Sequence, residues 1–96
     1  MGAYVGPNNA QMHNMLAGKL FAPPKSGNYR VDICLHWGAE CGQAAADEFC
    51  KSQNFASAAA FDYDNDVGAQ SPTLVLGDNK VCNTAACDAF KSIRCQ

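Results

Sequence analysis

The stretch from Cys34 to Cys41, CLHWGAEC, holds two thiols, an imidazole, an indole and a carboxylate. Three kinds of chemistry use such groups: half of a zinc site, a Cys/His nucleophile, or one arm of a disulfide framework beside an aromatic ring. A structural zinc site usually pairs two closely spaced cysteine knuckles, and the sequence has no Cys-x-x-Cys. A nucleophile needs a free thiolate beside the His36 imidazole. The cysteine count decides between these alternatives.

The chain has six cysteines, an even number for a short sequence. An even count in a small domain favours disulfides formed in an oxidising compartment. The apolar residues include many alanines, so the core would be thin, and each cross-link would contribute about 2–4 kcal/mol. We therefore expect a secreted, extracellular or periplasmic protein. The predicted disulfide cysteines are Cys34, Cys41, Cys50, Cys82, Cys87 and Cys95.

Spacing gives a partial expectation for the pairing. Cys82 and Cys87 can close a small local loop through NTAA. Cys50 lies on the inward side of an expected helix, so it should cross to a strand, with Cys34 and Cys95 as candidates. Cys41 then takes the cysteine that remains.

His36 and Trp37 follow an expected strand and precede Gly38, so they should lie at a strand end or in a loop. The interpretation we favour is that Trp37 packs over a disulfide or caps the core, because Trp is usually well buried. The functional alternative is an exposed ring against which a sugar or a peptide stacks. His36, Trp37 and Tyr63 are the candidate ligand-binding residues.

Asp62, Asp64 and Asp66 alternate in the segment FDYDNDVGAQSPT, as ligands do in calcium loops. The EF-hand template requires Gly at its sixth position and Glu at its twelfth, and Val67 and Thr73 stand there instead. We favour a solvated acidic turn, and the alternative is a weak calcium site. Calcium is the one candidate cofactor.

Composition excludes some classes of partner. Nine acidic and seven basic residues give a net charge of −2, and the bases are scattered singly. Nucleic acid and anionic membranes are bound by clustered Lys and Arg, so we expect neither as a partner. No apolar run approaches the roughly 20 residues of a membrane span, so we expect no membrane insertion. The first residues lack a secretory signal pattern, so we expect a mature form or another export route.

The front of the chain differs from the rest because it has no cysteine. Met12, Met15, Leu16 and Leu20 recur at helical spacing, which predicts a helix over 8–21 that Pro23 and Pro24 prevent from continuing. We therefore divide the chain into an N-terminal helical arm with a Pro-rich connector, 1–28, and a disulfide-rich α+β domain, 29–96.

Within that domain the pattern predicts one helix, 42–54, with Ala45, Ala46, Phe49 and Cys50 forming its inward stripe. The expected strands are 29–35, 55–63 and 89–95, with a hairpin over 72–82. The predicted fold class is α+β, with one main helix packed on a small antiparallel or mixed sheet and stabilised by disulfides.

Four segments within 29–95, YRVDICLHWGAECG, AADEFCKSQNF, SPTLVLGD and CDAFKSIRC, resemble small cysteine-rich domains of exported proteins. The segment AADEFCKSQNFASAAAF is also similar to the helix-then-strand stretch of scavenger receptor cysteine-rich domains. That likeness implies a recognition domain for proteins and glycans, often with calcium. It transfers no binding residues to this sequence.

These observations favour an extracellular binding module for a glycan or a cell-surface protein, with calcium as a candidate aid, over an enzyme. One alternative is a small defence protein, either an enzyme inhibitor or a hydrolase. A hydrolase would need a cleft with converging titratable groups, and the sequence offers no matched set. Another alternative is a structural module that forms homo-oligomers when its N-terminal arm docks into a neighbouring copy.

Overall fold

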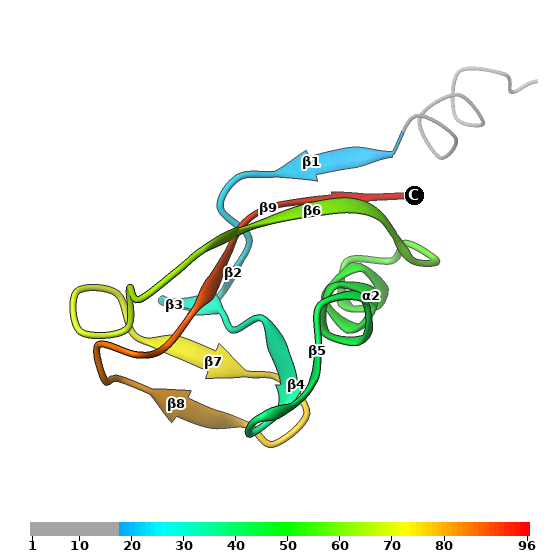
Figure 1. Cartoon of the computed structure of the whole chain (residues 1–96). Helices are drawn as coiled ribbons and strands as arrows, with labels where there is room; N and C mark the ends of the chain where they lie inside the picture. Colours follow the sequence, from blue (N-terminus) through cyan, green and yellow to red (C-terminus); the bar gives the residue numbers. More distant parts are fainter. Residues whose placement is uncertain (1–17) are drawn as a thin grey trace, which may run out of the picture.

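The structure is a computed structural model, and it describes residues 18–96. In this part of the chain one helix is combined with short strands, which confirms the predicted α+β class (Figure 1). The elements are β1 (Lys19–Phe21), β2 (Lys25–Ser26), β3 (Tyr29–Val31), β4 (Cys34–His36), β5 (Ala39–Cys41), α2 (Gln43–Ser52), β6 (Ala58–Asp64), β7 (Thr73–Val75), β8 (Lys80–Cys82) and β9 (Ala89–Cys95).

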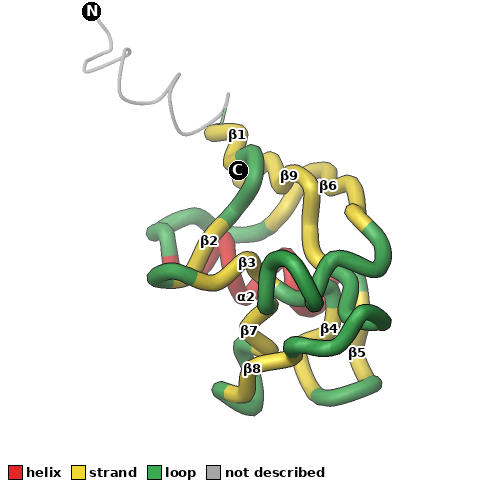
Figure 2. Tube along the Cα trace, turned by 90° about the vertical axis from the view of Figure 1, so that its left-hand side faces the viewer, coloured by secondary structure: helices red, strands yellow, loops and turns green. Residues whose placement is uncertain are grey.

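The strands form three small sheets. The first has the order β1-β9-β6 and is antiparallel throughout. The second, β2-β3-β7-β8, is mixed because β3 and β7 run parallel. The third is the β4-β5 hairpin. Figures 1 and 2 show the first sheet at one end of the fold and the hairpin, with β7 and β8, at the other.

The helix α2 agrees with its predicted range and face. It begins after Gly42, whose carbonyl oxygen accepts a hydrogen bond from the Ala46 N–H at 3.0 Å. It ends before Asn54, which takes a left-handed conformation with φ 70°. The predicted inward stripe is buried, as expected. Among residues 18–96, no helix is long and apolar enough to cross a membrane.

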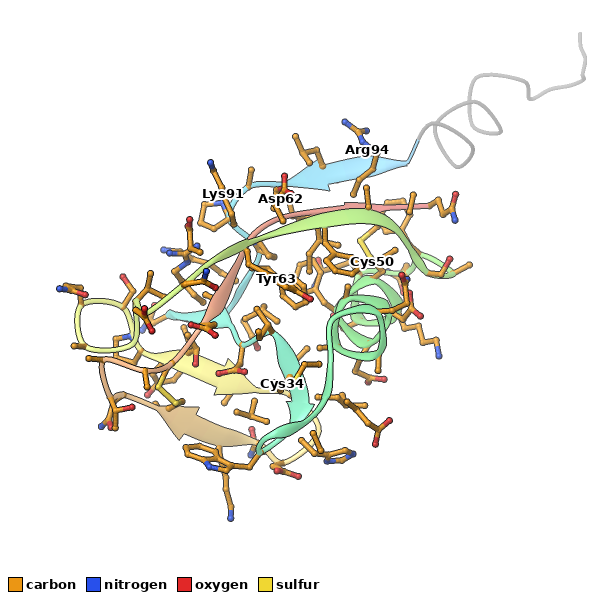
Figure 3. The ribbon with its side chains drawn as sticks, in the orientation of Figure 1. Cys34, Cys50, Asp62, Tyr63, Lys91 and Arg94 are labelled. Atoms are coloured by element: carbon orange, nitrogen blue, oxygen red, sulfur yellow. A yellow bond between two sulfur atoms is a disulfide. The ribbon has the colours of Figure 1, made fainter. Side chains whose placement is uncertain are left out.

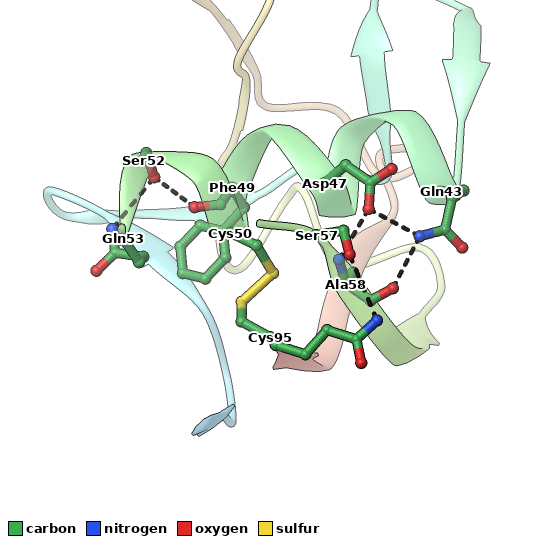
Figure 4. Close-up of a disulfide and its surroundings, with 10 residues drawn as sticks. Gln43, Asp47, Phe49, Cys50, Ser52, Gln53, Ser57, Ala58 and Cys95 are labelled. Atoms are coloured by element: carbon green, nitrogen blue, oxygen red, sulfur yellow. Dashed lines mark hydrogen bonds between the residues drawn. A yellow bond between two sulfur atoms is a disulfide. The ribbon is translucent and has the colours of Figure 1, made fainter. Parts of the chain in front are cut away.

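The core lies between α2 and the inner face of the β1-β9-β6 sheet. Phe49 from the helix and Phe90 and Ile93 from β9 are its largest buried side chains. Phe21 from β1 meets the Phe49 ring edge-on, with 5.0 Å between ring centroids. Figure 4 shows the Cys50–Cys95 disulfide joining α2 to β9 in this core. Both of its cysteines are fully buried.

All six cysteines are paired, which confirms the disulfide framework and excludes the zinc site and the free nucleophile. The bonds are Cys34–Cys41, Cys50–Cys95 and Cys82–Cys87. The local Cys82–Cys87 loop and the crossing from Cys50 to a strand were both expected. A small cysteine-rich domain with three disulfides indicates an oxidising environment.

The predicted continuous strand 29–35 is broken in two, as β3 and β4. The cause is the buried Asp32, whose carboxylate accepts hydrogen bonds from the Cys34 N–H at 2.9 Å and from Thr73 Oγ1 at 2.6 Å. An Asp that binds the backbone two residues later turns the chain. This turn sends β4 away from the β3 direction to pair with β5, a strand that the sequence did not predict.

The predicted helix 8–21 is wrong at its end, because Lys19–Phe21 is the strand β1, paired with β9. Packing of Phe21 against Phe49 outweighs the weak helical pattern there. The rest of that predicted helix, with Met12, Met15 and Leu16, lies outside the described residues. Since β1 and β2 both pair with strands of the body, the folded body includes residues before Tyr29.

Candidate functional site at Trp37

Trp37 stands out from the turn of the β4-β5 hairpin, with 57% of the residue exposed. The burial that we expected for this side chain is therefore wrong. Trp37 lies in a tight turn that Gly38 closes in a left-handed conformation, φ +71°. The Cys34–Cys41 disulfide ties the two strands together below the turn, so the indole is presented to solvent on a cross-linked hairpin.

Asp78, in the turn between β7 and β8, holds this hairpin with both carboxylate oxygens. Oδ2 accepts a hydrogen bond from the Trp37 backbone N–H at 2.7 Å, and Oδ1 lies 2.8 Å from His36 Nδ1. The neighbouring Gly77 N–H donates to the Leu35 carbonyl oxygen at 2.7 Å. A side chain at Gly77 would collide with that oxygen and with the His36 ring, so only glycine permits this close approach.

The charges around His36 favour its protonated form. The hydrogen bond to Asp78 is the main cause that raises the pKa of His36, and the negative charges of Asp78 and Glu40 add to it. Glu40 Oε2 lies 3.7 Å from His36 Nε2. The same contact lowers the pKa of Asp78, helped by the Trp37 backbone N–H and by Lys80. The protonated imidazole and the carboxylate thus form a partly exposed ion pair that holds the turn.

Two shallow depressions flank the indole. The first has a volume of about 330 Å³, and its lining includes Trp37, Asp32, Thr84 and Asp88. The second, of about 420 Å³, is lined by Trp37, Lys80 and Val81. Val81 is 39% exposed, so an aromatic and an aliphatic side chain lie together at the surface. We call the residues Trp37, Lys80, Val81, Thr84 and Asp88 the Trp37 face.

The structure does not gather the three carboxylates of the proposed calcium loop. Asp64 is paired with Arg30, with 2.7 Å between Oδ2 and the guanidinium nitrogen. The Asp66 backbone N–H donates to Asp88, and Asp62 points away from the fold on the outer face of β6 (Figure 3). Within residues 18–96, no three Asp, Glu, His or Cys side chains are grouped so that they could hold a metal ion.

Tyr63, the third candidate ligand-binding residue, lies on β6 and is 42% exposed. Its ring stacks on Phe61 with 5.7 Å between centroids and lies the same distance from Phe90. It lines neither depression beside Trp37. His36 and Trp37 therefore belong to one site, and Tyr63 belongs to the packing of the β1-β9-β6 sheet.

Sequence reasoning missed Asp78, Lys80, Val81 and Asp88. Asp78 and Lys80 were predicted only as part of the hairpin over 72–82, and that hairpin is confirmed. The residues of this site come from segments more than 40 positions apart. The sequence carries one weak signal for Asp78: an Asp that follows a Gly in a turn can accept a hydrogen bond from the backbone of another loop.

The site can hold a ligand against an aromatic ring. Both nitrogens of His36 face carboxylates, at 2.8 Å and 3.7 Å. In the described residues no hydroxyl or thiol forms a hydrogen bond with His36, which is the contact that nucleophilic catalysis would use.

Comparisons with known proteins identify no family. No protein-family model matches the chain, and searches of curated proteins and of solved structures find no match. The chain is therefore described by its structure, as a small cysteine-rich domain with three disulfides.

Proposed function

We propose that this protein is an extracellular recognition module that binds a glycan or a cell-surface protein through the Trp37 face. One observation supports the proposal above others: a large indole is exposed, yet its backbone is fixed by Asp78 and by the Cys34–Cys41 hairpin. A monomer gains nothing in stability from leaving such a ring in water, since burial of a large aromatic side chain is favourable.

The rigidity of the hairpin suits binding. Association costs free energy when loops and side chains must be ordered, and a hairpin held by a disulfide and two Asp78 hydrogen bonds is ordered beforehand. Trp is also among the residues that contribute most to protein interfaces. Stacking on an indole suits the apolar face of a sugar equally well. Calcium is not part of the proposal, because Asp64 is engaged by Arg30.

The test compares binding of the labelled protein with that of a Trp37→Leu variant on a glycan array and on intact cells, in the presence of a chelator. We expect the substitution to weaken binding by about tenfold or more, as for other central interface residues. The matched control is Tyr29→Leu, which removes a ring that is 38% exposed on β3. Equal binding by the Trp37 variant and the original protein would contradict the proposal, as would no binding to either surface.

A further inference from the structure

We propose that the depression between Trp37 and Asp88 takes a cationic group, the guanidinium or ammonium of an Arg or Lys side chain on a protein partner. This inference rests on the proposed function and names the ligand class for the same site. It follows from the chemistry of the lining, which combines an aromatic ring with two carboxylates and includes no basic side chain.

The ring and the carboxylates have different parts in such a site. The face of an indole attracts a cation by its quadrupole, and Trp does so better than the other aromatic residues. Asp88 Oδ1 accepts the Asp66 N–H at 2.8 Å, and within residues 18–96 its Oδ2 forms no hydrogen bond. Asp88 thus has an acceptor left for a ligand N–H, in the depression that the indole also lines.

Asp32 contributes charge rather than a contact. Its two oxygens are already used by the Cys34 N–H and the Thr73 hydroxyl, and the residue is only 6% exposed. Neither of these partners carries a positive charge, so the carboxylate is solvated by dipoles alone. A ligand cation in the adjoining depression would lie in the field of this charge, which water screens poorly at a buried site.

The distribution of charge over the fold favours the same ligand. Near the hairpin turn, the charges of Glu40 and Asp78 are offset by the protonated His36 and by Lys80. The charges of Asp32 and Asp88 beside Trp37 have no basic residue in the same lining and remain in excess. Most other bases lie on the strands β1, β2, β3 and β9, and Lys91 and Arg94 point outward from β9 in Figure 3. A basic partner is therefore drawn to the Trp37 end of the molecule.

A glycan would use the same ring but would not need the charge, so charge is the variable to test. Trp37 is the single tryptophan of the chain, so its fluorescence reports on the two depressions that its indole lines, and the Asp88 variant below tells them apart. The probe is N-acetyl-arginine amide, and the matched control is N-acetyl-citrulline amide, which has the same shape without the charge. We expect the arginine probe to change the Trp37 emission saturably and to bind several-fold more tightly than the citrulline probe.

Two charge-removing variants locate the effect. Asp88→Asn keeps the oxygen that accepts the Asp66 N–H and removes the charge, so we expect binding of the arginine probe to weaken about two- to fivefold, as for a partly exposed ion pair. Asp62→Asn makes the same change on the outer face of β6 and should leave the affinity unaltered. Unchanged amide NMR spectra away from each substitution would show that both variants fold.

The outcomes separate this inference from the proposed function. Equal affinity for the arginine and citrulline probes, no response to the arginine probe at tens of millimolar, or equal loss in both variants would overturn the cation site. A glycan that binds and quenches Trp37 with no effect of Asp88→Asn would also overturn it and leave the proposed function standing. Loss of array and cell binding in Asp88→Asn, matched by Trp37→Leu, would support both.

Discussion

The two ends of this molecule use disulfides in different ways. At the α2 end, Cys50–Cys95 is fully buried, lies among Phe49, Phe90 and Ile93, and joins residues 45 positions apart. At the Trp37 end, Cys34–Cys41 and Cys82–Cys87 close loops of 7 and 5 positions, and Cys41 is exposed. One end has a packed core, and the other has short cross-linked loops beneath an exposed indole.

If the proposed function holds, the difference assigns stability to the α2 end and recognition to the Trp37 end. A cross-link restricts the unfolded chain more when it closes a longer loop, so Cys50–Cys95 should contribute about 4 kcal/mol and each short bond about 2 kcal/mol. The short bonds fix local geometry, which a binding surface requires. Changes at the Trp37 face should therefore alter binding with little effect on unfolding.

The largest effect should come from the long cross-link. The double substitution Cys50→Ala with Cys95→Ala should lower the free energy of unfolding by about 4 kcal/mol, because it releases the long loop. Urea-induced unfolding followed by circular dichroism measures it. Replacing both cysteines avoids a free thiol.

The matched control is Cys82→Ala with Cys87→Ala, which should cost about 2 kcal/mol for its shorter loop. An equal or larger loss in this control would contradict the assignment of stability to the α2 end. Titration of the same two variants with the arginine probe would show whether loss of Cys82–Cys87 weakens probe binding more than loss of Cys50–Cys95 does.

An intermediate effect is expected at Asp47 on α2. Its Oδ1 accepts hydrogen bonds from Gln43 Nε2 and from the Ala58 backbone N–H, both at 2.8 Å, and so ties the helix to the start of β6 (Figure 4). Asp47→Ala leaves the Ala58 N–H without this partner and should cost about 1–2 kcal/mol in thermal unfolding. Glu48→Ala, at the exposed next position, should cost less than about 0.5 kcal/mol. An equal loss of stability in Asp47→Ala and Glu48→Ala would contradict this interpretation.

The smallest effect concerns pH at the Trp37 end. Because the pKa of His36 is raised above 6.5 in the folded protein, protonation of His36 contributes its full stabilisation to the fold below pH 6.5. That stabilisation is lost as the pH rises through the folded pKa of His36. On the acid side, the pKa of Asp78 is lowered from 3.8, so its contribution is lost only as the pH falls through that lower pKa.

An NMR titration of the His36 ring protons measures this directly. In Asp78→Asn the midpoint should move down towards 6.5, because the carboxylate that raises it is gone. Asp62→Asn removes a distant charge and serves as the control. A midpoint that does not respond to Asp78→Asn would show that the contact does not hold the hairpin in solution.

Local patterns were enough to predict several elements. The period of Ala45, Ala46, Phe49 and Cys50 predicts one inward face of a helix, and that face is buried. The turn GDNK between two apolar runs predicts the β7-β8 hairpin. The even cysteine count predicts the disulfide framework, since six thiols in a small core favour pairing. The helix and the hairpin depend on neighbours along the chain, and the disulfide framework was predicted from composition.

The errors arose where distant residues decided the outcome. Lys19–Phe21 forms a strand because it pairs with β9 and because the Phe21 ring packs against the Phe49 ring. Asp32 breaks a strand by accepting the Cys34 N–H, and its other carboxylate oxygen accepts the hydroxyl of the distant Thr73. The partners β9, Phe49 and Thr73 all lie more than ten residues from the segments that they affect.

The sequence by itself determined that the chain folds as a disulfide-linked α+β domain, because periodicity and cysteine number act through local geometry and composition. Only the tertiary structure decided that Trp37 is exposed and that Asp78 holds its hairpin. The physical reason is that exposure and hydrogen bonding depend on which loops meet in space, and here the two loops are separated by 41 positions.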